Sequence, residues 1–414
     1  MRRVLFLGAI AMLLAYTVMA YHFWDQVRNG YSDFISFYTA GQILQRDEAE
    51  KLYDLNLQYE IQREHAPGVN IRAGALPFVR PPFEAWLFLP LAKLDYFSAF
   101  LLWDLLTIAL LIATSVMARS HIPGLNGVPA ILTVLAMFSY YPVFLTLLQG
   151  QDSVVLLLVF FLTYVTLRAQ RELTGGLVLG LGIFKFPLVI PFLIPFFVAK
   201  RIRLLAGFCI TSLVLAGISL WTTGVRSLSE YPGYLLAVDK FARGVNDPRD
   251  MPNLRGLLSV ILGHSVSPGV LKIVIAVVSL LLVGWLATKY HAFVPGESTL
   301  FSLAFSLDVI VTMLVSYHAH VFDLVLLLPF LGISLGMVMS QDSLPPQSRR
   351  LLGLAAGCIL FSPLYVVLTL LSPYTTVFAL ILLGTSFVLF RAISGLEDST
   401  SLQEQSSALP THSH

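Results

Sequence analysis

Long apolar stretches separated by short polar breaks run along almost the whole chain. Stretches of about 20 apolar residues are long enough to cross a bilayer as a helix. We assign such spans to 3–22, 97–118, 129–147, 153–169, 176–198, 204–222, 268–288, 298–316, 320–338, 351–371 and 375–391. A shorter apolar run, 82–94, follows a Pro-Pro pair and predicts either a short span or a re-entrant helix. Counted as a span, it brings the total to about twelve transmembrane helices with both termini on the cytoplasmic side.

Basic residues orient these spans, because cytoplasmic loops carry an excess of lysine and arginine. Arg168 and Arg171 fall on the wrong side in the twelve-span arrangement. The basic residues that share one side are Arg2, Arg3, Lys93, Lys200, Arg201, Arg203, Lys289, Arg349, Arg350 and Arg391.

A second arrangement removes this conflict. It makes 82–94 re-entrant and folds 176–198 into two half-helices that meet at Lys185-Phe186-Pro187. It also moves Gly150-Gln151-Asp152 to the outside. We prefer the twelve-span arrangement. Both arrangements place three segments on the extracytoplasmic face, namely 23–81, 223–266 and 317–321.

Composition agrees with a membrane protein. Of the 414 residues, 57% are hydrophobic and 12% are charged, against about 25% charged in a soluble domain. Continuous apolar runs such as 154–165 exclude the alternating strands of a β-barrel. The fold class expected is therefore an all-α polytopic membrane protein. A net charge of +2 gives no reason to expect a nucleic-acid partner, and we interpret Cys209 and Cys358 as buried apolar side chains.

The chain divides into one transmembrane domain, 1–393, and a tail, 394–414, rich in Ser, Glu and Gln that we expect to be a disordered cytoplasmic end. The domain carries two large extracytoplasmic loops, about 23–81 and about 223–266. Helical apolar spacing in the first loop predicts two short amphipathic helices on the membrane surface, and Asp54 is placed to cap the second of them.

Asp33 is the first candidate for chemistry. It follows the first span on the far side of the membrane, where a carboxylate is costly unless it is solvated, paired or used. Ser32 and Asp33 precede an apolar periodic run, so Asp33 is also a natural helix N-cap. The two interpretations are compatible, since a carboxylate at a helix N-terminus can also act as a base at the lipid surface.

Several short motifs occur in a fixed order: Asp33-Phe34, Leu52-Tyr53-Asp54, Arg80-Pro81-Pro82-Phe83, Gly150-Gln151, Gly175-Gly176 to Lys185, Asn253…Arg255-Gly256 and Ser316-Tyr317-His318-Ala319-His320. With this order and spacing the chain resembles glycosyltransferase family 87, which comprises polyprenyl-phosphate-mannose-dependent mannosyltransferases of the GT-C superfamily. Two positions depart from the family pattern. Arg80 stands where an aromatic residue is usual, and Asp152 stands where Asn is commoner, which leaves acceptor specificity open.

The resemblance implies that Asp33 is a general base for an inverting transfer. It would deprotonate an acceptor hydroxyl that attacks the anomeric carbon of a polyprenyl-phosphate hexose, most simply mannose. Polyprenyl phosphate is already a good leaving group, so no second carboxylic acid is needed. The implied acceptor is a lipid-linked sugar or another glycan. The implied location is the inner (plasma) membrane, with the active site extracytoplasmic and surrounding lipid as a further partner.

The leaving phosphate needs cations or hydrogen-bond donors. Lys185 interrupts an apolar span and would face either an anion or, by snorkelling, the interface. Arg80 and Arg255 could bind phosphate bidentately or be solvated loop arginines. We also expect His318 or His320 to bind the phosphate or sugar, in preference to a metal. No cofactor is implied, although a divalent cation is compatible with the pattern.

Three further polar residues have structural interpretations. Gly150-Gln151-Asp152 is most simply a turn between spans. Asp308, in a predicted span, could pair with Lys185 or Lys272, and Asp323 could pair with one of the histidines. The alternative function is a membrane transporter or lipid flippase, but the hydropathy profile shows no repeated halves of the kind many transporters have.

Overall fold

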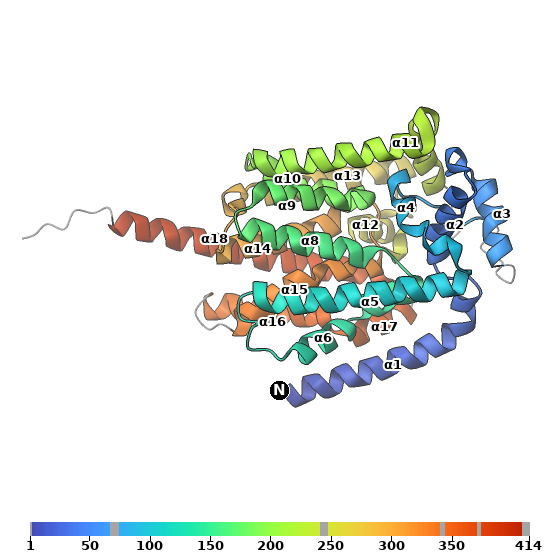
Figure 1. Ribbon diagram of the computed structural model, residues 1–414. Coiled ribbons are helices and arrows are strands. Elements are labelled where there is room, and N and C mark those ends of the chain that lie inside the picture. The colour runs from blue at the N-terminus through green and yellow to red at the C-terminus, as the bar shows by residue number, and fades with distance from the viewer. Residues whose placement is uncertain (1, 67–73, 241–246, 340–343, 371–373, 408–414) are drawn as a thin grey trace, which may run out of the picture.

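The computed structural model describes residues 2–66, 74–240, 247–339, 344–370 and 374–407. Within those ranges it is a bundle of helices without a strand (Figure 1). The long helices of the bundle are α1 (Arg2–Arg28), α5 (Tyr96–His121), α8 (Ser153–Arg168), α11 (Ile202–Lys240), α13 (Pro268–Ala287), α14 (Thr299–Val315) and α18 (Val377–Ser407). The shorter ones are α2 (Phe34–Gln45), α3 (Leu55–His65), α4 (Ala85–Phe88), α6 (Ala130–Phe138), α7 (Tyr141–Gln149), α9 (Glu172–Gly180), α10 (Phe186–Val198), α12 (Leu254–Leu262), α15 (Leu328–Met339), α16 (Pro346–Leu360) and α17 (Ser362–Leu370).

The polytopic membrane class is confirmed. Among the described residues, seven helical segments are long and apolar enough to cross a membrane, one of them Glu172–Val198, or nine if each of the bent pairs α6–α7 and α16–α17 is one span. Helices α8 and α14 are apolar but shorter. The long helices run roughly horizontally in Figure 1, and helices α2, α3 and α4 of the first loop gather at the right-hand end of the bundle.

The segment from Glu172 to Val198 passes the length test for one span but doubles back on itself. Arg201, just after its end, lies 3.6 Å from the carboxylate of Glu172 at its start. Helices α9 and α11 also advance in the same direction, because Gly176 packs against Leu204 and Gly180 against Phe208. The intervening α10 must therefore return.

The expected single span over 176–198 is thus wrong, and the two half-helices of the second arrangement are present. The turn falls where a short 3-10 helix, η4 (Leu181–Lys185), meets Phe186-Pro187. Proline removes a backbone donor and favours a helix start, so it fits the first turn of α10. As a result Arg168 and Arg171 lie at the same end of the bundle as Arg201, as the positive-inside rule requires.

The expected span over 82–94 is also wrong. Its residues form three short turns of helix, η2 (Pro82–Glu84), α4 and η3 (Leu91–Lys93). They pack against α2, whose Tyr38 hydroxyl donates to the Leu94 carbonyl and whose Gln42 amide donates to the Ala92 carbonyl. Prolines and short length prevent a membrane-crossing helix here, so Lys93 stays on the side of the first loop.

The first loop is folded into the protein instead of lying on the bilayer. Helix α2 has almost every residue buried, because α3, α4 and α5 surround it. Its all-round apolar surface therefore serves as core, which corrects our expectation of an amphipathic surface helix. The predicted N-cap of helix α3 is confirmed, because the Asp54 carboxylate accepts hydrogen bonds from the backbone N–H groups of Asn56 and Leu57.

Two smaller expectations also change. Helix α18 continues to Ser407, past Ser394, where we placed the start of a disordered tail; residues 408–414 lie outside the described residues. Cys209 and Cys358 are free thiols, but they are exposed on the helix surfaces, not buried.

Helix α9 lies so close to α11 that glycine is required at the contact. A Cβ added to Gly176 would stand 1.9 Å from the Leu204 carbonyl oxygen, whereas one added to Gly217 of α11 would meet nothing within 4 Å. Gly176→Ala should therefore lower stability by about 1–3 kcal/mol through overpacking. Gly217→Ala should be neutral or stabilising, by up to about 1 kcal/mol, through helix propensity. Unfolding midpoints of the two purified variants in the same detergent test this; equal midpoints would contradict the close packing.

Candidate active site

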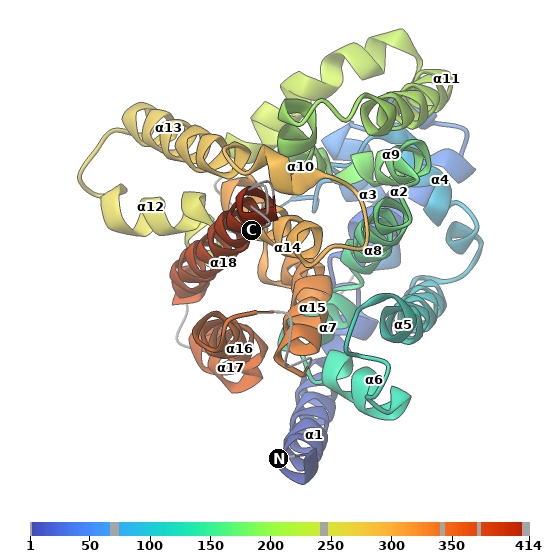
Figure 2. The ribbon, with the colours of Figure 1, turned by 90° about the vertical axis from the view of Figure 1, so that its left-hand side faces the viewer.

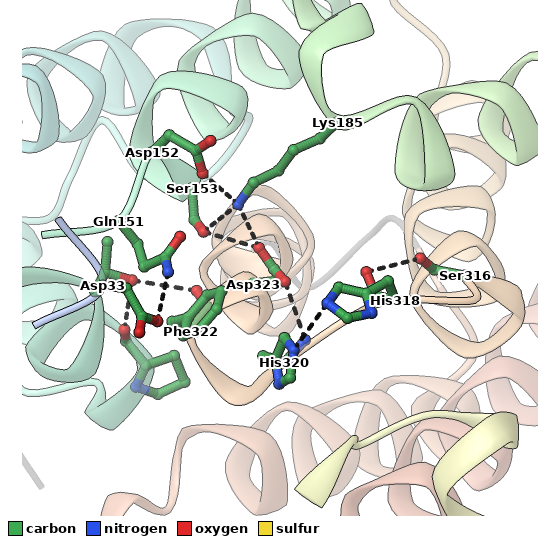
Figure 3. Close-up of polar contacts among 12 residues, drawn as sticks. Asp33, Gln151, Asp152, Ser153, Lys185, Ser316, His318, His320, Phe322 and Asp323 are labelled. Atoms are coloured by element: carbon green, nitrogen blue, oxygen red, sulfur yellow. Dashed lines mark hydrogen bonds and ion pairs between the residues drawn. The ribbon is translucent and has the colours of Figure 1, made fainter. Parts of the chain in front are cut away.

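Four segments distant in the sequence bring their polar residues together at the first-loop end of the bundle. They are the start of α2, the turn between α7 and α8, the tip of the α9–α10 hairpin, and the connection from α14 into a 3-10 helix, η7 (Val321–Leu327). Figure 3 shows that the side chains from these segments point toward one another. The sequence candidates Asp33, Lys185, His318 and His320 are all among them.

Asp33 occupies the N-cap position of α2, but its side chain makes no capping hydrogen bond. Its carboxylate oxygen instead accepts a hydrogen bond of 2.7 Å from the Gln151 side-chain amide. The backbone N–H of Asp33 donates to the Gln149 side chain, so both ends of the residue are tied to the α7–α8 turn. The turn can approach this closely because Gly150 is left-handed (φ 61°), and a Cβ there would stand 2.7 Å from Phe34.

Lys185 is 3% exposed and has each of its three ammonium donors engaged. Its Nζ lies 2.6 Å from Asp152 Oδ1, 2.6 Å from Asp323 Oδ1 and 2.6 Å from Ser153 Oγ. Ser153 in turn donates to the same Asp323 oxygen at 2.8 Å. Lys185 therefore does not snorkel to the interface. It joins the hairpin tip to the start of α8 and to η7 (Figure 3).

Arg80 extends this ion cluster toward the first loop. Its Nε and Nη2 bind the two oxygens of Asp152 at 2.8 and 3.1 Å. Burial would raise the pKa of Asp152, but the charges of Arg80 and Lys185 outweigh it and lower the pKa to about 2. Glu84, 1% exposed, lies 3.7 Å from Arg80 Nε. Burial, reinforced by the negative charge of Asp152, raises the pKa of Glu84 well above its usual range.

The two histidines form a pair beside the cluster. Their Nε2 atoms are 3.2 Å apart, and the backbone N–H of His320 donates to the second oxygen of Asp323 at 3.0 Å. Burial lowers the pKa of His320 to about 4, although the Asp323 charge opposes this, and burial also lowers the pKa of His318 well below its usual value. Both rings are therefore neutral near pH 7, so one can donate to the other.

Arg255 approaches the same segment from the second loop. It is 7% exposed, its guanidinium lies 4.0 Å from the ring centre of Tyr317, and it donates to the Tyr317 carbonyl. Asn253, the N-cap of α12, holds the neighbouring Ser316 carbonyl at 2.9 Å. The second loop thus fixes the backbone that presents His318.

Sequence reasoning missed part of this cluster. Asp152, which we interpreted as a turn residue, is its central anion; the only signal was its departure from the Asn that is common after Gly-Gln. Asp323 binds Lys185 and the His320 backbone, not a histidine ring. Asp308 does not pair with Lys185, and neither of its carboxylate oxygens has a hydrogen-bond partner in the described part of the chain. No group of three or more His, Cys, Asp or Glu residues within the described ranges is arranged to hold a metal ion.

The fold and the site define a polytopic helical membrane protein with a charged and histidine-containing site at one end of its bundle. The family model of glycosyltransferase family 87 matches residues 78–317, more than half of the chain. The chain therefore belongs to glycosyltransferase family 87, as its motifs suggested. The matched range contains Arg80, Lys185 and Arg255, whereas Asp33 and the histidine pair lie outside it. Comparisons with curated proteins and with solved structures gave no match.

Removing the lysine from the ion cluster should be strongly destabilising. Lys185→Met would leave Asp152 and Asp323 buried without their shared cation, and breaking a buried ion pair costs about 3–5 kcal/mol. Adding Asp323→Asn to this variant should recover part of the loss, because the uncompensated charge of Asp323 is then gone and Asp152 keeps Arg80 as its partner. Thermal unfolding of the three purified proteins measures both effects; an unchanged midpoint for Lys185→Met would show that the cluster contributes little.

The neutral histidine pair predicts a pH dependence. The folded pKa of His320, about 4, lies below its ordinary value of 6.5. Between pH 6.5 and 4 the His320 ring therefore takes up a proton in the unfolded chain but not in the folded protein. The contribution of His320 to the unfolding free energy is complete above pH 6.5 and is lost as the pH falls toward 4. The difference in unfolding free energy between the wild type and His320→Gln should change between pH 7 and 4. A difference that stays constant over this range would contradict a neutral His320.

Proposed function

We propose that this glycosyltransferase transfers a hexose, mannose in the first instance, from a polyprenyl-phosphate donor to a lipid-linked or glycan acceptor, with inversion. Asp33 is the general base. The reaction takes place on the extracytoplasmic face of the inner membrane. The observation that carries the proposal is the Asp33 carboxylate, which is held by Gln151 instead of capping its helix, directly beside the Asp152–Lys185 cluster.

The proposed step needs only one carboxylate. Asp33 takes the proton of an acceptor hydroxyl while the hydroxyl oxygen of the acceptor forms a bond to the anomeric carbon of the donor. The bond from that carbon to the phosphate oxygen breaks, and polyprenyl phosphate leaves with the electron pair. Since attack and departure occur on opposite faces, the configuration at the anomeric carbon inverts. Positioned proton transfer of this kind is worth about 10²–10⁴-fold in rate.

The hydrogen bond from Gln151 suits a base. An amide N–H stabilises the charged form of Asp33 and fixes its orientation without supplying a positive charge. A direct ion pair with Arg80 or Lys185 would hold the carboxylate as a weaker base. Both cations are instead engaged by Asp152, which lies next to Gln151 in the sequence.

In this proposal the donors for the leaving phosphate come from Arg80, Arg255 and the histidine pair. Arg80 binds Asp152 through Nε and Nη2, and its five N–H groups exceed what that carboxylate accepts. We assign phosphate binding to Arg80, Arg255 and the His318–His320 pair, which would stabilise the charge that develops on the leaving oxygen. Lys185 has its three donors occupied by Asp152, Asp323 and Ser153, so in this proposal it positions the other groups instead of binding phosphate directly.

Asparagine at position 33 tests the base. Asp33→Asn keeps the shape of the side chain but cannot accept the proton, so product formation should fall by at least about 10²-fold. Asp54→Asn is the matched control, because it makes the same change in the same loop and asparagine still caps a helix. The assay incubates each purified protein with labelled polyprenyl-phosphate-mannose and membrane lipid extract and follows the glycosylated product.

Two outcomes would count against the proposal. Normal turnover by Asp33→Asn would remove the base assignment while leaving the reaction intact. No product from the wild type with mannose, glucose or other lipid-phosphate sugars, together with measured flux of a solute across proteoliposomes, would favour a transporter.

A further inference from the structure

Three tyrosines hold three successive backbone carbonyls just before the Pro-Pro pair. The hydroxyl of Tyr234 donates to the carbonyl of residue 78 at 3.1 Å, and that of Tyr231 donates to residue 79 at 2.9 Å. The hydroxyl of Tyr53 donates to the carbonyl of Arg80 itself at 2.8 Å. We call Tyr53, Tyr231 and Tyr234 the tyrosine clamp.

The clamp is a packed unit drawn from both extracytoplasmic loops. The Tyr53 ring stacks on Tyr231 with centroids 4.8 Å apart and lies 4.9 Å from Tyr234. Tyr53 belongs to the first loop, whereas the other two lie on the distal part of α11. That part is turned away from the membrane-crossing part at Gly224 (φ 75°, ψ 171°), a conformation that favours glycine. Figure 2 shows this distal part of α11 lying across the end of the bundle.

The clamped segment has no regular structure of its own. Residues 75–79 are neither helix nor strand, so their backbone groups need partners from elsewhere. The clamp supplies three donors, and the Gln58 side chain accepts from the Phe78 N–H at 3.0 Å. The segment is therefore held residue by residue up to Arg80, whose guanidinium then reaches Asp152.

We propose that the tyrosine clamp is a positioning device that aims Arg80 at the donor phosphate. The inference rests on the proposed function, since it takes Arg80 to be a phosphate ligand. Its consequence is specific: the three hydroxyls act on donor affinity through Arg80 and leave proton transfer at Asp33 unchanged. It also gives the second loop a role in donor binding from a distance, although Tyr231 and Tyr234 need not touch the donor.

Phenylalanine substitutions remove the hydroxyls and keep the stacked rings. Each single variant, Tyr53→Phe, Tyr231→Phe or Tyr234→Phe, should raise the donor KM by about 2- to 10-fold, the equivalent of one net hydrogen bond, with kcat within about twofold. The triple variant should show the largest rise. Tyr16→Phe is the matched control, because its hydroxyl also donates to a backbone carbonyl, that of Ser139, but far from the site. Its KM should not change.

Making the triple phenylalanine change in an Arg80→Gln protein distinguishes an effect on the position of Arg80 from a general effect on stability. If the clamp acts through Arg80, the triple phenylalanine change should add no further rise in KM once the guanidinium is gone. An equal rise in both backgrounds, or a fall in kcat without a change in KM, would overturn the inference. Amide hydrogen exchange should also quicken at residues 78–80 in the triple variant and not in Tyr16→Phe.

Failure of the proposed function gives a different result. If the wild type transfers no sugar, binding of polyprenyl phosphate itself is measured by quenching of tryptophan fluorescence. Weaker binding by the triple variant than by the wild type would then support the clamp even though the transfer reaction had been assigned wrongly. Equal affinities of the two proteins would overturn the clamp, whatever the outcome of the transfer assay.

Discussion

Burying the ammonium group of Lys185 is the constraint on which the arrangement of the site depends. A lysine within an apolar bundle is tolerated only when its charge is balanced and its donors are satisfied. Here that requires an anion from the α7–α8 turn, Asp152, and a second from η7, Asp323. The hairpin tip, the start of α8 and the start of η7 must therefore meet at one point, although they are far apart in the chain.

The same meeting point also holds the residues of the proposed active site. Gln151, next to Asp152, reaches the Asp33 carboxylate, and the second oxygen of Asp323 holds the backbone of His320. The proposed base is therefore linked to Asp152 through the neighbouring Gln151, and the histidine pair is linked to Asp323 by one hydrogen bond. A change in the ion cluster would therefore alter the surroundings of both Asp33 and the histidine pair.

The sequence predicted the helical membrane class, and it placed the first loop, the second loop and residues 317–321 on one side, where the structure brings them to one end of the bundle. Apolar length is a local property, and the positive-inside pattern constrains orientation, so both can be read from the chain. The hairpin at Lys185 was only the less favoured arrangement, because a continuous apolar run over 176–198 looks the same whether it crosses once or returns. Arg168 and Arg171, which lie on the wrong side in the twelve-span arrangement, were the sequence signal for the hairpin.

Pairings between distant segments could not be read from the chain. Asp152 was interpreted as a turn residue because nothing local shows that Lys185 and Arg80 converge on it. Helix α2 was expected at the membrane surface. The spacing of its apolar residues predicts a helix but does not show that α3, α4 and α5 cover it. The tyrosine clamp was equally invisible, since its three hydroxyls bind backbone carbonyls, which every residue possesses.

Charge balance in the cluster also constrains the proposed chemistry. The two cations Arg80 and Lys185 are matched by the two anions Asp152 and Asp323, and the raised pKa of Glu84 favours its neutral form, so the charges of the cluster are nearly balanced. A strongly positive pocket would bind the released polyprenyl phosphate more tightly than the donor, because the product carries more negative charge. In a neutral cluster with Arg80 at its rim, binding of the phosphate depends on directed hydrogen bonds more than on net charge. Orientation of Arg80 and Arg255 then matters more than their number. Tyr231 and Tyr234 hold the backbone just before Arg80, and Arg255 is oriented by its hydrogen bond to the Tyr317 carbonyl.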